Sequence, residues 1–349
     1  MSNPYKDLDS KAFWKPSVAD QSMFEICNLW DPKFNIKKSD RIATFGSCFA
    51  QYIGNALDSK GYCWLRTEKP PVGLSSKSCE RYNYDRFSAR TGNIYTATLL
   101  KQWTSWAIGD TEVPDEVWKD GNRFFDPMRP TVEPNGFNSA DEVRLSLAET
   151  ISAFRESIRR ADYFVFTLGL TESWVNVEGG YEYPMCPGTA AGEYNPDNHK
   201  FVDLQFQEII SSLNEAVKMM RSINPELKFI LTVSPVPLTA TYTNKHVVVA
   251  TMAAKSKLRA VASQLSENRR YIDYFPSYEF INSPVYKGAF FNPNQRSVNQ
   301  HGVQFVMENF FKCLHSKFGS EIEMSSYSAP ASTLTESSCD EELLGAFGK

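Results

Sequence analysis

The chain has 349 residues, of which 42% are apolar and 22% charged, and its formal net charge is −4. This composition is that of an ordinary globular protein, so it excludes wholesale disorder, collagen and coiled coil. Nucleic-acid binders are set aside as well, because they usually carry a basic face. No run of about 18 apolar residues occurs, so the sequence predicts no membrane span. The length fits either about two domains or one α/β domain with long insertions.

The N-terminal residues and the cysteines bear on location and on metal binding. The first 14 residues lack a basic stretch followed by an apolar one, so no secretory signal is expected. The seven cysteines form no Cys-x-x-Cys pair or Cys/His cluster, which predicts neither a disulfide framework nor a metal site. We therefore expect reduced thiols, a cytoplasmic location and no cofactor.

Strands and helices alternate along the chain after an extension over residues 1–40. An apolar run at 41–45 predicts a strand, helical spacing at 48–57 predicts the next helix, and a hairpin is expected at 174–183. Further strands are expected at 162–168, 228–233 and 271–275, and further helices at 94–107, 140–160, 203–222, 247–265 and 302–318. This alternation predicts a parallel sheet covered on both faces, formed by residues 41–320. The Ser- and acid-rich tail at 321–349 is expected to be disordered.

Three loops are expected to meet at one edge of this sheet. They are Gly46–Cys48, Gly169–Glu172 and Ser234–His246, and each follows a predicted strand. The carboxyl ends of parallel strands lie at the same edge, where open α/β sheets bind their ligands. The sequence therefore predicts a site built from these three loops.

The first loop carries the clearest chemical signal. In Phe45-Gly-Ser-Cys-Phe-Ala50, Ser47 and Cys48 fall at the N-terminus of a predicted helix. Free backbone N–H groups there can form an oxyanion hole, and the same field favours a thiolate. The alternative is that Ser47 caps the helix and Cys48 is a small buried apolar residue.

Further blocks follow this motif in order and carry a family resemblance. They are Phe87-Ser-Ala-Arg90 with Gly92-Asn-Ile-Tyr95, Thr167-Leu-Gly-Leu-Thr-Glu-Ser-Trp174, Val233-Ser-Pro-Val-Pro-Leu238 with His246 and Ser256, and Phe275-Pro-Ser-Tyr-Glu279. With Gly46-Ser-Cys-Phe-Ala50 they resemble the GSCFA domain family over about 41–310. That family is similar to SGNH/GDSL-type hydrolases. The resemblance implies a flavodoxin-like three-layer sandwich with long loop insertions, and the cleavage or transfer of acyl groups.

The resemblance also implies roles at the first turn. The hydrolases' Gly-Asp-Ser-Leu pattern, placed without a gap, makes Cys48 the nucleophile, whereas a shift of one residue makes it Ser47. We favour Cys48, because a thiolate needs less help from a base. Gly92 and Asn93 are weak matches for the oxyanion-supporting glycine, and Asn93 would donate an amide N–H.

The hydrolases' Gly-x-Asn-Asp block resembles Gly169-Leu-Thr-Glu172. Thr171 then replaces an amide donor with a hydroxyl, and Glu172 would orient a base or a substrate hydroxyl. The alternative is that both residues cap the following segment. Ser234, at the end of the third strand, is expected to contact substrate.

The hydrolases' Asp-x-x-His is absent here, because its positions fall on Asn294 and Ser297. His246 is the favoured base, since it lies in a site loop and imidazole takes a proton near neutral pH. His301 is the alternative, either as base or substrate-binding group or as a helix-cap residue. His199 is expected in a turn and His315 on the surface.

Two arginines lie near the predicted site loops. Arg90 and Arg296 are each expected either to bind a carboxylate or phosphate or to form a salt bridge.

Two hypotheses of function follow. The first is an acyl-transfer enzyme, an esterase or O-acyltransferase, that acts on a carbohydrate or cell-envelope ester, with acyl-CoA as a possible donor. The second is a non-catalytic module that binds a sugar or acyl ligand on the same scaffold. A weaker third reading, from composition alone, is a scaffold that binds protein partners through the tail. The oligomeric state stays open.

Overall fold

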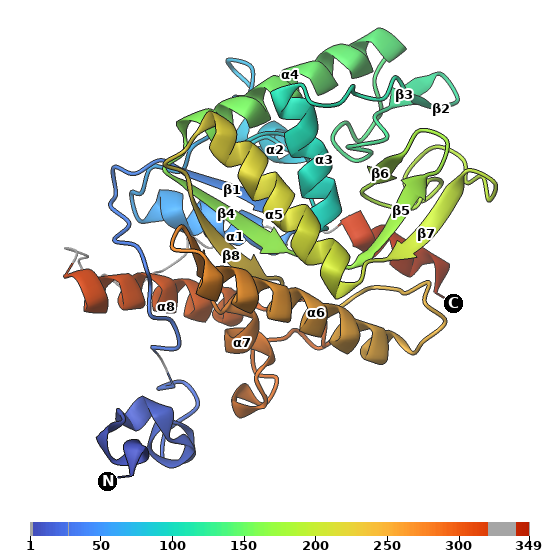
Figure 1. Ribbon diagram of the computed structural model, residues 1–349. Coiled ribbons are helices and arrows are strands. Elements are labelled where there is room, and N and C mark those ends of the chain that lie inside the picture. Colours follow the sequence, from blue (N-terminus) through green and yellow to red (C-terminus); the bar gives the residue numbers. More distant parts are fainter. Residues whose placement is uncertain (1–2, 27, 320–339, 349) are drawn as a thin grey trace.

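Figure 1 shows the computed structural model, which describes residues 3–26, 28–319 and 340–348. Four parallel strands form the central sheet, in the order β1 (Ile42–Gly46), β4 (Tyr163–Leu168), β8 (Lys228–Val233) and β9 (Ile272–Tyr274). Every residue of these four strands is buried except Lys228 at the start of β8, because helices cover both faces of the sheet. On the outer side of β1, Trp64 forms a single parallel bridge with Ile42. This three-layer α/β sandwich confirms the expected fold class.

The strands divide their side chains between two apolar clusters. The first cluster holds Phe45, Phe164 and Phe229 and the inner faces of α3 (Ala97–Ile108), α4 (Ala140–Arg160), α5 (Phe206–Ile223) and α6 (Val247–Asn268). The second holds Ile42, Val165 and Ile230 with α1 (Phe49–Ser59), α7 (Ser277–Asn282) and α8 (Gln300–Phe318). In Figure 1, α5 and α6 lie in front of the sheet and α1 behind it.

The long helices form where the sequence predicts them, and local signals fix their ends. Ser139 caps α4 by accepting a hydrogen bond from the N–H of Glu142 at 3.2 Å. Acidic residues in its first turn and arginines in its last complement the helix dipole. The predicted bounds of α4, 140–160, are confirmed.

Insertions surround one end of the sheet. A short helix, α2 (Ser76–Arg81), and a hairpin of β2 (Trp118–Asp120) and β3 (Arg123–Phe125) lie between the predicted helices, where no element was expected. β5 (Glu172–Asn176) and β6 (Tyr181–Tyr183) confirm the predicted hairpin, and β7 (His199–Asp203) extends it to three strands. The expectation of a turn at His199 is wrong. This buried side chain accepts the N–H of Asn195 on Nδ1, and its ring lies against Tyr183.

The two ends of the chain differ in how they pack. The short turns η1 (Pro4–Asp7), η2 (Ser10–Ala12) and η3 (Lys15–Ala19) bury no residue, whereas Trp30 and Ile36 are buried in the second cluster. A further turn, η4 (Pro284–Tyr286), precedes α8. The expected disorder at 321–349 is wrong for Asp340–Phe347, which form a 3-10 helix, η5, against the domain; residues 321–339 lie outside the described chain.

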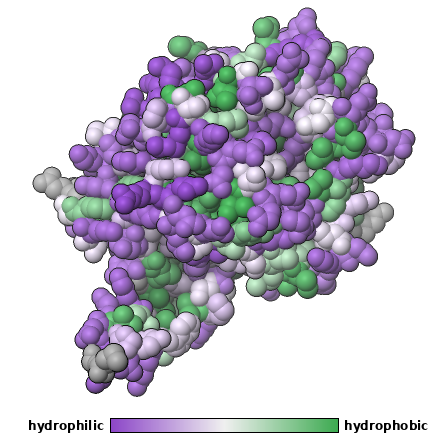
Figure 2. Space-filling view, in the orientation of Figure 1, coloured by the Kyte–Doolittle hydropathy of each residue, from purple (hydrophilic) through white to green (hydrophobic). Residues whose placement is uncertain are grey.

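The surface in Figure 2 is mainly hydrophilic, with apolar side chains scattered between the polar ones on the face shown. Within the described ranges, no helix is both long and apolar enough to cross a membrane.

Candidate functional site

The turn after β1 depends on Gly46. Its φ of +126° lies in the region that L side chains rarely adopt, and an added Cβ would stand 2.6 Å from the backbone N of Thr167 in β4. The N–H of Ser47 donates to the carbonyl of Thr167 at 3.0 Å. β1 and β4 therefore approach each other closely at the start of α1.

The three predicted loops do come together. A Cβ at Gly169 would lie 2.9 Å from the Cβ of Ser47, so the loops after β1 and β4 touch. The N–H of Ser234 donates to the carbonyl of Leu168 at 2.8 Å, which ties the loop after β8 to the same edge. The predicted meeting of these loops at the carboxyl ends of the strands is confirmed.

Ser47 and Cys48 are both buried, each with 2% of its surface exposed. The Oγ of Ser47 has no hydrogen-bond partner among the described residues, whereas a buried hydroxyl usually has one. Cys48 is the N-cap residue of α1, and its side chain makes no capping hydrogen bond. Its thiol belongs to the apolar cluster beside α1 and α8. Ser47 is thus the turn residue with an unused polar group.

Glu172 joins two of the loops and faces a cavity. Its carboxylate accepts hydrogen bonds from the Oγ1 of Thr241 at 2.6 Å and from the N–H of Tyr242 at 3.0 Å. Burial raises the pKa of Glu172, and the nearby Asp203 carboxylate adds to the rise. Thr171 instead donates its hydroxyl to Asp203 at 2.7 Å. The interpretation of Thr171 as an oxyanion donor is therefore wrong in this state.

Among the described residues, no hydrogen bond joins either histidine proposed as a base to the buried Ser47 and Cys48. His246 is exposed at the N-cap of α6, where its Nδ1 accepts the N–H of Val248 at 3.2 Å. A neutral imidazole that accepts on Nδ1 carries its proton on Nε2, so this ring has no spare lone pair. His301 is exposed in the first turn of α8. As the structure stands, His246 acts as a cap and lacks the free nitrogen that a base needs.

The segment from Arg90 to Asn93 makes its side-chain contacts with residues outside the first turn. Asn93 is buried, and its Nδ2 donates to the carboxylate of Asp340 in η5 at 2.6 Å. Gly92 adopts a φ of +66° with open space at its Cα. Arg90 pairs with Glu133 at 2.8 Å, which is the salt bridge that the sequence offered as one of its two roles.

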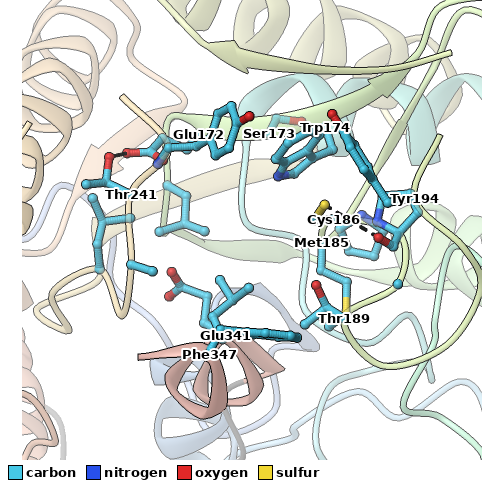
Figure 3. Close-up of a pocket in the computed structure, with 18 of the residues that line it drawn as sticks. Glu172, Ser173, Trp174, Met185, Cys186, Thr189, Tyr194, Thr241, Glu341 and Phe347 are labelled. Atoms are coloured by element: carbon cyan, nitrogen blue, oxygen red, sulfur yellow. Dashed lines mark hydrogen bonds between the residues drawn. The ribbon is translucent and has the colours of Figure 1, made fainter. Parts of the chain in front are cut away.

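A cavity of about 680 Å³ opens beside Glu172. Its walls come from β5, the 184–194 loop, the loop after β8 and the C-terminal η5. Figure 3 shows Glu172 and Trp174 on one side, with Glu341 and Phe347 on the opposite side. Trp174 packs edge to face with Tyr194 and Tyr242, at centroid distances of 5.4 and 5.2 Å. A pocket of this size, with aromatic walls and the carboxyl groups of Glu172, Glu193 and Glu341 in its lining, suits a small organic ligand.

Some residues of this region escape the sequence analysis. Lys255 is 1% exposed, and its Nζ donates to the carbonyl of Gly169 at 2.8 Å. Its place on the buried stripe of α6, three and seven residues before Leu258 and Ala262, is the signal that could have found it. Trp174 is half-buried at the cavity, and one aromatic residue in a strand gives no such signal. In the part of the chain that the structure describes, no group of three His, Cys, Asp or Glu side chains could hold a metal ion.

The blocks at the meeting point of the loops lie inside one matched region. The model of the GSCFA family matches residues 41–310, from β1 into α8. The chain belongs to the GSCFA family. In this GSCFA protein, the matched region contains the first turn, the loop after β4 and the loop after β8, whereas η5 lies beyond it.

Two further comparisons concern curated proteins and solved structures. No curated protein matches the chain significantly. Among solved structures, this GSCFA protein is similar to a carbohydrate esterase of family 3 from Talaromyces cellulolyticus, with 13% identity and a TM-score of 0.25. That match covers 65% of this chain and 92% of the esterase. A likeness of this size carries no inference about activity.

Proposed function

We propose that this protein cleaves or transfers acyl esters, as an esterase or O-acyltransferase, with a nucleophile from the turn at Ser47 and Cys48. One observation supports the proposal most: the Ser47 hydroxyl is buried without a partner against Gly169, where three loops meet. An unpartnered buried hydroxyl costs stability, and such groups often have a functional role. The proposed nucleophile is either this hydroxyl or the adjacent Cys48 thiol.

The chemistry follows from the start of α1. The attacking oxygen or sulfur bonds to the ester carbonyl carbon, and the carbonyl oxygen becomes an oxyanion. The first N–H groups of a helix lack acceptors within it, so those of Cys48 and Phe49 can stabilise that charge. His246 remains the proposed base, on the condition that its cap on Val248 opens and frees Nδ1. The bond between the carbonyl carbon and the ester oxygen then breaks, and the alcohol leaves with the proton that His246 took from the nucleophile. Water or a hydroxyl of the acceptor attacks the acyl-enzyme, gives its own proton to His246 and releases the nucleophile.

The cavity supports an ester of a carbohydrate or cell-envelope component as substrate. Aromatic walls from Trp174 and Tyr242 can pack on the apolar face of a sugar ring or on an acyl chain. Glu172 would bind or orient a hydroxyl of the acceptor. Acyl-CoA is the donor we propose for the transfer reaction, and we propose a cytoplasmic location.

The test is the hydrolysis of p-nitrophenyl esters of increasing chain length by matched variants. We expect Ser47→Ala or Cys48→Ala to lower kcat/KM by about a hundredfold or more, because removal of a nucleophile removes the covalent route. Ser212→Ala and Cys79→Ala are the controls, since both are buried residues outside the site. Full activity of both site variants would refute the proposal.

The second candidate function is a binding module without turnover. The turn that replaces Asp-x-x-His favours it, because the side chains of Asn294 and Ser297 bond to each other at 3.0 Å. Binding of an acetylated sugar without its hydrolysis, unchanged in Ser47→Ala, would support this candidate.

A further inference from the structure

The C-terminal segment η5 (Asp340–Phe347) buries two of its three acids and exposes two of its large apolar side chains, whereas Leu344 is half-buried. Asp340 and Glu341 each have 8% of their surface exposed, whereas Leu343 and Phe347 have 42% and 68%. A segment that docks through the hydrophobic effect shows the reverse pattern. Polar contacts of the two carboxylates must therefore hold much of this segment in place.

Asp340 sits in a cradle made by two separate loops. Its carboxylate accepts hydrogen bonds from the Nδ2 of Asn93 at 2.6 Å and from the Oγ1 of Thr131 at 2.7 Å. The charge of Arg86 also acts on this carboxylate. The Oδ1 of Asn93 is buried and has no hydrogen-bond partner among the described residues. One more donor would therefore be accommodated beside the bound carboxylate.

Glu341 lies at the mouth of the cavity among charged groups of the domain. Its carboxylate is 3.5 Å from the guanidinium of Arg296, which also pairs with the exposed Glu342 at 3.2 Å. The backbone of Thr239 favours the charged form of Glu341. The positive charge of Lys255 attracts it, and the negative charge of Glu172 repels it. Figure 3 shows Glu341 reaching toward the cavity from the C-terminal segment.

These contacts have the chemistry of an anion-binding site. Amide, hydroxyl and guanidinium donors from four parts of the domain converge on two carboxylates, and charge-assisted hydrogen bonds of this kind are the stronger ones. Burial nevertheless raises the pKa of both carboxyl groups, so their charged forms are held at a cost. An occupant that is bound at a cost can be exchanged for another.

We propose that the groups that hold Asp340 and Glu341, at the mouth of the cavity and next to it, form a binding site for a ligand that presents two neighbouring carboxylates, and that η5 is its tethered competitor. The chain's own Asp340 and Glu341 fill the site in this state, and an external dicarboxylate ligand enters by displacing them. The Nδ2–H of Asn93 then donates to the carboxylate that occupies the site, whether this belongs to Asp340 or to the ligand. The inference does not depend on catalysis, because it concerns binding alone.

The test measures binding of a peptide with the sequence of residues 340–349, DEELLGAFGK, to full-length protein. The peptide carries a fluorophore, and affinity is read from its anisotropy. In Asp340→Lys/Glu341→Lys, the tethered segment is repelled by the cations of the site and no longer competes. We expect this variant to bind the peptide at least about tenfold more tightly than wild type, since a tethered competitor has a high effective concentration.

Two controls keep the result specific. Asp7→Lys/Asp9→Lys makes the same change in net charge on exposed residues outside the segment, and it should bind the peptide as wild type does. A peptide with both leading acids replaced by lysine should bind neither protein. Adding Thr131→Val to the charge-reversed protein should weaken binding of the original peptide, because a donor to the carboxylate is lost.

Equal affinity of the peptide for wild type and for the charge-reversed variant would overturn the proposal. Equal affinity of the original and charge-reversed peptides would overturn it too, because apolar contacts would then hold the segment. If the variant fails to fold, hydrogen exchange of residues 340–347 in wild type gives a second test. Excess peptide should remove the protection of these amides, and unchanged protection would count against the site. Loss of ester hydrolysis alone would bear on the proposed function and leave this result intact.

Discussion

Gly46 sets how closely β1 and β4 approach at the site. Both its positive φ and the nearby backbone of Thr167 exclude a side chain. We expect Gly46→Ala to lower the free energy of unfolding by about 2 kcal/mol or more, because it adds a clash to the strain of the backbone. Urea denaturation measures the change. Gly61→Ala is the control, since Gly61 has a φ of +73° but open space around it. An equal loss in both variants would mean that the clash contributes nothing.

His246 has two separable roles, as a cap and as a proposed base. His246→Asn keeps a side-chain acceptor at the N-cap of α6 but cannot take a proton at neutral pH, whereas His246→Ala removes both roles. If His246 is the base, both variants lose ester hydrolysis, and only His246→Ala also loses about 1 kcal/mol of stability. Measured kcat and urea midpoints distinguish the cases. Full activity of His246→Asn would leave His246 with the capping role alone.

At the scale of elements, the strands and long helices are predictable from the sequence, because apolar spacing alone determines which face is buried. β1, β4, β8 and α4 all form at the predicted positions. β7 and η5 are missed for a physical reason. Their positions depend on polar contacts with distant residues, such as Asp340 with Asn93, and no local pattern encodes these.

The same limit applies to the candidate site. The meeting of the three loops follows from the topology of a parallel sheet, so the sequence predicts it. The hydrogen-bond partners do not follow from topology. Asn93 and Thr171 donate to Asp340 and Asp203 respectively, and only the tertiary structure brings these pairs together.

Docking of η5 should depend on pH. Burial raises the pKa of Glu341 to about 6. The negative charge of Glu172 adds to the rise, whereas the positive charges of Arg296 and Lys255 oppose it. A carboxyl whose pKa is higher when docked binds its proton more tightly in that state. Its contribution to docking is therefore full below the ordinary glutamate pKa of about 4.5 and is lost as the pH rises through about 6.

Hydrogen exchange of residues 340–347, corrected for intrinsic rates, tests this pH dependence. We expect greater protection at pH 5 than at pH 7.5, and a smaller difference between the two in Glu341→Gln, which does not titrate. Glu226→Gln is the control, because it removes an exposed carboxylate outside the segment. Protection that increases with pH would show that the ion pair with Arg296 outweighs the cost of burial.

At the scale of the whole molecule, the N-terminal extension has two parts with different roles. Residues 3–14 are exposed, whereas Trp30 stacks on Phe310 at 5.0 Å and meets Phe275 edge to face at 5.1 Å. We expect Trp30→Ala to cost about 3–5 kcal/mol of stability, as truncation of a buried aromatic side chain does. Removal of residues 1–14 should leave the free energy of unfolding unchanged. Urea denaturation compares the two, and a large loss on truncation would contradict this division.

In the proposed reaction, a nucleophile at the first turn carries the acyl group. The most direct measurement is peptide mapping by mass spectrometry after the full-length protein is quenched during turnover of p-nitrophenyl acetate. We expect an acetyl adduct on Ser47 or Cys48 that is lost in the corresponding alanine variant. Turnover with no adduct on either residue, and with both alanine variants fully active, would contradict it.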